Sequence, residues 1–127
     1  MTKLILVAGG GALGSAGRYL VGRVAGQMMP GTQLPLGTFA VNIAGGFAMG
    51  LLAGWLTRLS PQAAEPWRLL VGVGLLGGFT TFSAFSLETF SMIERGQLVT
   101  ALGYALASVV GAVVALALGF AIMRGVA

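Results

Sequence analysis

The chain has 127 residues and a net charge of +4, with 57% apolar and 8% charged residues. Soluble domains average about 45–50% apolar and about 25% charged residues, so this composition, with a mean hydropathy of +0.95, excludes an ordinary soluble domain. Cys, His and Asp are absent and the basic residues are scattered, which excludes disulfides and His/Cys metal motifs and argues against an enzyme or a nucleic-acid partner.

Four apolar segments are long enough to cross a bilayer, which takes about 20 helical residues. They are residues 4–25, 36–56, 69–93 and 98–123. The first follows Lys3 as in a signal peptide, but its apolar run exceeds the ~7–15 residues of a signal core. The linkers contain Pro, Gly and charged residues, as turns between helices do. We therefore predict an all-α, single-domain, multi-pass protein of the cell (inner) membrane.

Glycines recur at a spacing of four within the spans, which allows helix backbones to approach closely. The pairs and triplets are Gly10 and Gly14, Gly22 and Gly26, Gly46, Gly50 and Gly54, and Gly74 and Gly78. We interpret them mainly as packing positions within one bundle. Four short helices are too few to enclose a solvated pore, so a transport function predicts an oligomer.

The basic residues near the span ends give only a weak orientation signal. One side would hold Lys3, Arg58, Arg68 and Arg124, and the other Arg23 and Arg95, with Arg18 deeper. Orientation follows the Lys and Arg excess, so this small excess is compatible with a single orientation. It is also compatible with insertion in both directions and head-to-tail pairing.

Polar residues lie inside the first and second spans. Arg18 is about two turns from the end of its span, where an Arg costs about 2.5–3.5 kcal/mol even on the lower scales. It either faces a polar partner or reaches the interface by its length. Asn42 follows Thr38 by one helical turn. Its amide either joins neighbouring helices or presents N–H groups to an anion.

The third span contains the segment "GGFTTFS", in which glycines and hydroxyl residues interrupt an apolar helix. Its unusual members are Gly77, Gly78, Thr80, Thr81 and Ser83. Glycine weakens a helix and hydroxyls compete for its backbone. A broken helix exposes carbonyls at one end and N–H groups at the other, which suit a cation and an anion respectively. The segment therefore predicts a helix break that forms an ion site.

Aromatic and hydroxyl residues continue this pattern beyond the break. Phe82 and Phe85 are three residues apart, with Glu88 one turn further. Phenylalanines usually serve packing alone, but ring edges are electropositive and can line a path for a small anion. On the fourth span, Tyr104 and Ser108 form a stripe with Thr100 that fits a water-filled track, although such hydroxyls can also bond to their own helix.

These motifs together resemble the Fluc (CrcB) family of fluoride channels. The similarity rests on "GRY" in the first span, "NIAG" in the second and "GGFTTFSAFSLE" in the third, and covers essentially the whole chain. It implies passive fluoride export through an antiparallel, dual-topology homodimer in the lipid bilayer. It also implies a structural sodium ion on the two-fold axis, held by the backbone carbonyls of Gly77 and Thr80 from both subunits.

The resemblance also implies roles along the fluoride path. Phe82 and Phe85 would be the aromatic residues of the pore, Tyr104 and Ser108 its polar track, and Arg18 a vestibule residue. The remaining predicted pore residues, which include the fluoride-facing donors, are Asn42, Thr81 and Ser83. The family commonly has a hydroxyl residue where this chain has Ala84, and some members have one in place of Ala112, which changes the donors along the track.

Two other functions compete with a channel. A small four-span multidrug exporter would need a membrane-embedded acid in the first span, where this chain has Arg18 and no carboxylate. A purely structural membrane subunit would not need a broken polar helix. Fluoride efflux from liposomes, compared with chloride efflux, separates these alternatives.

Overall fold

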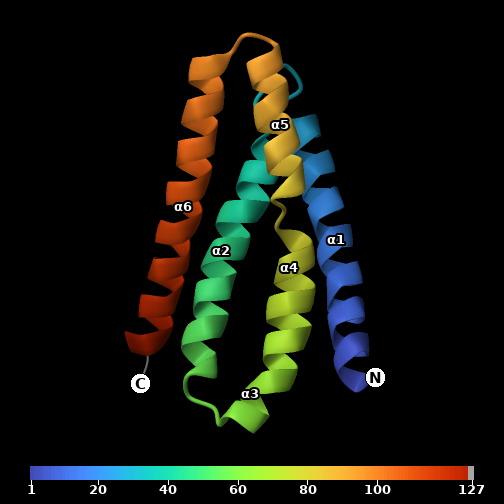
Figure 1. The fold of residues 1–127 in the computed structure, drawn as a ribbon, viewed down its shortest axis with the longest axis vertical. Coiled ribbons are helices and arrows are strands. Elements are labelled where there is room, and N and C mark those ends of the chain that lie inside the picture. Colours follow the sequence, from blue (N-terminus) through green and yellow to red (C-terminus); the bar gives the residue numbers. More distant parts are fainter. Residues whose placement is uncertain (126–127) are drawn as a thin grey trace.

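The structure is a computed structural model that describes residues 1–125, and the chain forms an all-α bundle (Figure 1). In chain order the helices are α1 Thr2–Met28, α2 Leu36–Leu56, α3 Pro61–Trp67, the π-helix η1 Arg68–Leu76, α4 Gly77–Phe79, α5 Ser83–Glu94 and α6 Leu98–Gly125. Four helical stretches are long and apolar enough to span a membrane, the third being the bent run Pro61–Glu94. The predicted fold class, with a broken third span, is confirmed.

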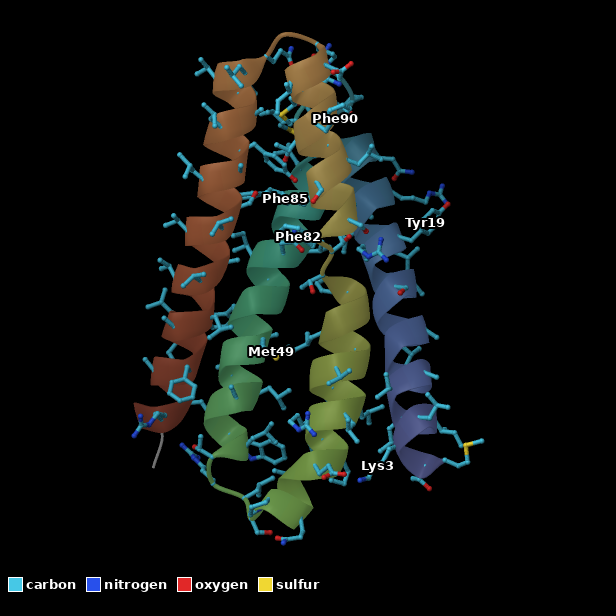
Figure 2. All side chains as sticks on the ribbon, in the orientation of Figure 1. Lys3, Tyr19, Met49, Phe82, Phe85 and Phe90 are labelled. Carbon is cyan, nitrogen blue, oxygen red and sulfur yellow. The ribbon has the colours of Figure 1, made fainter. Side chains whose placement is uncertain are left out.

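The helices extend beyond most of the predicted spans. Only α2 has the predicted bounds, and the third span starts as early as Pro61. Ser60 is its N-cap and accepts a hydrogen bond from the Ala63 N–H at 3.3 Å, with proline at the first helical position. An ion pair of 2.6 Å between Lys3 and Glu65 joins this start to α1, and Figure 2 shows Lys3 on the side of α1 that faces α3.

Helices approach closely along two interfaces, one between α2 and α6 and one between α1 and the third span. On α2, a Cβ added to Gly46 would lie 2.9 Å from the Ala112 carbonyl oxygen of α6, and one on Gly54 would lie 2.8 Å from Cβ of Met123. On α1, a Cβ added to Gly14 would lie 2.8 Å from the Phe79 backbone nitrogen. Most of the spaced glycines thus have the predicted packing role. A Cβ on Gly22 or on Gly26 would meet no atom within 4 Å.

The turn between α5 and α6 fixes how these two helices lie together. Gly96 has φ of 77°, a left-handed conformation that suits glycine. The Gln97 N–H donates to the Met92 carbonyl at 2.9 Å, which closes the end of α5. Met92 is fully buried and packs with Ala101 and Tyr104. This small core holds the C-terminal part of α5 beside the first turns of α6.

The third span changes its geometry twice before it breaks. The π-helix η1 is followed by one α-helical turn, α4, and the chain becomes extended at Thr80, with φ −84° and ψ 161°. The predicted weak points Gly77 and Gly78 are therefore still helical, and the break follows them. Close packing explains this, because a Cβ on Gly78 would lie 2.5 Å from the Gly11 oxygen of α1. The π-helix has no counterpart in the prediction.

Both termini lie at the same end of the bundle as α3, and the α5–α6 turn lies at the opposite end (Figure 1). The basic residues are therefore divided between the two ends of the bundle as the four predicted spans required. The end with the termini carries Lys3, Arg58, Arg68 and Arg124, and the other end Arg23 and Arg95.

Candidate functional site

Asn42 holds the break of the third span against α2. Its Nδ2 donates to the Thr81 carbonyl at 3.0 Å, and its Oδ1 accepts from the Thr81 N–H at 2.8 Å. The Thr81 hydroxyl in turn accepts from the Ala84 N–H at 3.1 Å at the start of α5. Side chains therefore satisfy the Thr81 N–H and carbonyl and the Ala84 N–H, as backbone groups at membrane depth require. The amide bonds between spans, and its second N–H stays available to another acceptor.

Arg18 forms a hydrogen bond with the backbone on the N-terminal side of the break. Its Nε donates to the Gly78 carbonyl of α4 at 3.1 Å, and the residue is half-buried. A cation at a helix C-terminus is favourable because the last carbonyls carry partial negative charge. Of the two roles that the sequence left open for Arg18, a polar partner is the one found.

The carbonyl oxygens at the end of α4 differ in the hydrogen bonds that they accept. The Leu76 oxygen accepts from both the N–H and the hydroxyl of Thr80, each at 2.9 Å. Within residues 1–125, the carbonyl oxygens of Gly77 and Thr80 accept no hydrogen bond. Gly77 is also exposed on the surface of the single chain. These two oxygens are therefore available to a ligand.

Three aromatic rings connect the break to α6. The ring centroids of Phe82 and Phe85 are 5.6 Å apart, and those of Phe85 and Tyr104 are 5.3 Å apart. Figure 2 shows Phe82 and Phe85 between α5 and α6, in front of α2. Phe85 is half-buried, whereas Phe82 is 77% exposed. The row therefore runs from the outer surface to the interior.

The hydroxyls of Tyr104 and Ser108 are buried, and neither has a hydrogen-bond partner in the described part of the chain. A buried polar group without a partner costs about 1–3 kcal/mol, so these two hydroxyls are candidates to bind an ion or water. Thr100, which the sequence placed on the same stripe, is exposed. The buried part of the stripe is thus Tyr104 and Ser108.

A cavity of about 350 Å³ brings most of the predicted pore residues together. It is lined by Asn42, Gly45, Gly46, Met49, Thr80, Thr81, Phe82, Phe85, Ser108, Val109, Ala112, Val113 and Leu116. Tyr104 adjoins it through its contact with Phe85. Ser83 is exposed outside it, with its hydroxyl 3.4 Å from that of Thr81.

The prediction missed several residues of this region. Gly45 and Met49 are three and seven residues after Asn42, so helical spacing would have placed them on its face. Figure 2 shows Met49 on the α4 side of α2. The Thr38 hydroxyl donates to Glu88 Oε1 at 2.6 Å in a neighbouring cavity of about 310 Å³. No sequence pattern pairs these residues, which are 50 positions apart.

The described residues hold no group of three His, Cys, Asp or Glu side chains that could bind a metal ion. The oxygens present at the break are backbone carbonyls and the side-chain oxygens of Asn42, Thr80 and Thr81. Carbonyl oxygens suit hard cations, whereas softer transition metals prefer nitrogen and sulfur ligands.

Comparison with known proteins gives close similarities over nearly the whole chain. The family described as CrcB-like protein, Camphor Resistance (CrcB), matches residues 5–120. A fluoride-specific ion channel FluC of Caulobacter sp. (strain K31) is 55% identical over 98% of this chain and 96% of its own. The same-named protein of Novosphingobium aromaticivorans is 51% identical over 100% of both chains.

Proposed function

Because the chain belongs to the CrcB family, we propose that it is a passive, fluoride-selective channel that exports fluoride across the cell membrane. The observation that carries this proposal is the cavity beside the break, which combines the Asn42 amide, the Ser108 hydroxyl and two phenylalanines. Relatives with more than half of their residues identical carry the name of fluoride channels.

The chemistry of the cavity suits a small, strongly hydrated anion. The second N–H of Asn42 and the unpartnered hydroxyls of Tyr104 and Ser108 replace water as donors. The positive edges of Phe82 and Phe85 add weak attraction without a fixed charge. Conduction requires sites that bind strongly enough to admit the ion and weakly enough to release it. Dispersed neutral donors satisfy both conditions.

Efflux from liposomes tests this function. We expect purified protein to release fluoride rapidly and chloride at least ~100-fold more slowly, a difference of about 2.7 kcal/mol in barrier. Equal rates for the two anions would contradict fluoride selectivity. Efflux that requires a proton gradient would instead indicate an exporter, and no efflux at all would indicate a structural subunit.

The sodium ion is the second part of the proposal. The Gly77 and Thr80 carbonyl oxygens accept no hydrogen bond within the described chain, and the C-terminal end of α4 carries partial negative charge. Two such oxygens from each of two subunits form a site of hard ligands for a small cation. The ion is structural, because a position on the symmetry axis lies off both pores.

Thr80→Ser tests whether backbone oxygens hold this ion. Serine retains the hydroxyl that bonds to Leu76, so the variant keeps fluoride flux and sodium dependence if only carbonyls bind sodium. Gly77→Leu is the contrasting variant, because a bulky side chain at this exposed position blocks approach of a partner. Replacement of sodium by a large organic cation should dissociate the dimer. Unchanged assembly and flux after prolonged dialysis would contradict a structural ion.

The third part is an antiparallel, dual-topology homodimer. Phe82 is 77% exposed and the pore cavity opens onto the same surface of the single chain. A two-fold axis in the membrane plane would pair this surface with itself. Gly77, whose carbonyl the shared sodium ion requires, is also exposed and lies on the same broken span. The weak charge difference between the two ends is compatible with insertion in both directions.

A further inference from the structure

A third cavity, of about 350 Å³, lies between α1, the start of α2 and the break. It is lined by Arg18, Tyr19, Gly22, Arg23, Gly37, Thr38, Thr81 and Ala84. Two of these side chains are guanidinium cations, and none is a carboxylate. Glu88 lines the adjacent cavity, where Thr38 donates to it. The lining therefore combines two positive charges without a counter-charge of its own.

The two arginines of this cavity have different surroundings. Arg18 is half-buried, and its Nε donates a hydrogen bond to the Gly78 carbonyl. Arg23 is exposed, and within residues 1–125 it has no ion pair or hydrogen bond. It lies five residues further along α1, or about 7.5 Å at 1.5 Å per residue. Arg18 thus stabilises the break, whereas the charge of Arg23 has no partner within residues 1–125.

Thr81 lies at the boundary between this basic cavity and the pore cavity. It lines both the basic cavity and the cavity that contains Phe82 and Ser108. Its backbone is fixed by Asn42, so the boundary has a defined position. An anion held beside Arg23 therefore lies in a cavity that borders the break and has Thr81 in common with the pore cavity.

We propose that Arg23 is a capture residue, whose guanidinium concentrates fluoride at the mouth of the basic cavity and so sets the rate of entry at low fluoride. This inference rests on the proposed fluoride channel function. Clefts lined by charge of one sign raise local counter-ion concentration and the rate of association. The effect depends on salt, since the screening length is about 30 Å at 0.01 M and about 3 Å at 1 M ionic strength.

The test compares fluoride efflux of wild-type protein, Arg23→Gln and Arg23→Lys in liposomes. At about 0.01 M ionic strength we expect Arg23→Gln to lower the initial rate roughly threefold, and at about 1 M of an impermeant organic salt we expect no difference. Arg23→Lys keeps the charge and the rate. The rate at saturating fluoride should not change, because Arg23 lies outside the pore cavity.

Arg95→Gln is the matched control. It removes the same charge from the same end of the bundle, at the α5–α6 turn (Figure 1), but Arg95 does not line the cavity. Equal effects of Arg23→Gln and Arg95→Gln, or an Arg23→Gln effect that is insensitive to salt, would overturn the proposal. If Arg23→Gln fails to assemble, Arg23→Met gives the same neutralisation. Absent fluoride efflux from wild-type protein would refute the channel function instead.

Discussion

One amide side chain determines the geometry of the break. Asn42 pairs with both the N–H and the carbonyl of Thr81, so it replaces the two bonds that a continuous helix would have given this residue. The arrangement is specific to Asn, because only a side-chain amide offers a donor and an acceptor side by side at this length. Loss of the amide leaves two backbone groups unpaired.

Asn42→Ala should therefore impair both folding and conduction. Each unpaired buried backbone group costs about 1–3 kcal/mol, and we expect a lower thermal midpoint in detergent and at least ~10-fold slower fluoride efflux. Ser91→Ala is the control, because the Ser91 hydroxyl bonds only to Leu87 within its own helix, at 2.9 Å. Wild-type efflux from Asn42→Ala would show that the pairing with Thr81 is dispensable.

Tyr104→Phe should separate stability from conduction. The Tyr104 hydroxyl is buried and unpartnered within the described chain, so its removal relieves an unsatisfied group and leaves the thermal midpoint equal or higher. Fluoride efflux should fall roughly tenfold, or about 1.4 kcal/mol of barrier, if this hydroxyl solvates the passing ion. A lower midpoint with normal efflux would assign the hydroxyl a structural role.

Among the elements, the third span shows most clearly what the sequence reveals. Its hydroxyl-rich segment predicted a break, and the chain indeed becomes extended at Thr80. The sequence could not show that Gly77 and Gly78 stay helical, because the stabilising contact comes from Gly11 on another helix. The π-helix was also unpredictable, since its additional residue per turn leaves no distinct pattern in an apolar run.

The same limit applies to the site. Helical spacing paired Phe82 with Phe85 and Tyr104 with Ser108, and the family resemblance placed both pairs along one path. In the structure Phe85 contacts both Phe82 and Tyr104. In contrast, the bond from Arg18 to Gly78 joins residues 60 positions apart. A single sequence indicates that Arg18 needs a partner at membrane depth, but only the fold identifies which carbonyl accepts from it.

The interface between α1 and the third span should tolerate substitution unequally. A Cβ on Gly14 would lie 2.8 Å from the Phe79 nitrogen and would also meet the Leu75 oxygen, whereas one on Gly9 meets nothing within 4 Å. Gly14→Ala should therefore displace α4 and lower the yield of folded protein and its thermal midpoint. Gly9→Ala is the control and should leave both unchanged. Equal behaviour of the two variants would contradict this packing.

For the whole molecule, the termini and α3 at one end and the α5–α6 turn at the other make orientation measurable (Figure 1). We expect a C-terminal tag to be accessible from both sides of the cell membrane, because the two ends differ little in Lys and Arg. Labelling of intact and permeabilised cells measures the two fractions. Accessibility from one side alone would contradict the antiparallel dimer, while leaving the channel function open to a parallel assembly.

The bond between Arg18 and Gly78 has a consequence for biosynthesis. Its acceptor is 60 residues downstream, which corresponds to at least about 3 s of translation at about 20 residues per second. During this interval the nascent first span carries a guanidinium without its carbonyl, at a depth where charge is costly. The first span should therefore stay near the insertion machinery, or at the lipid surface, until the third span emerges, and the two should enter the bilayer together.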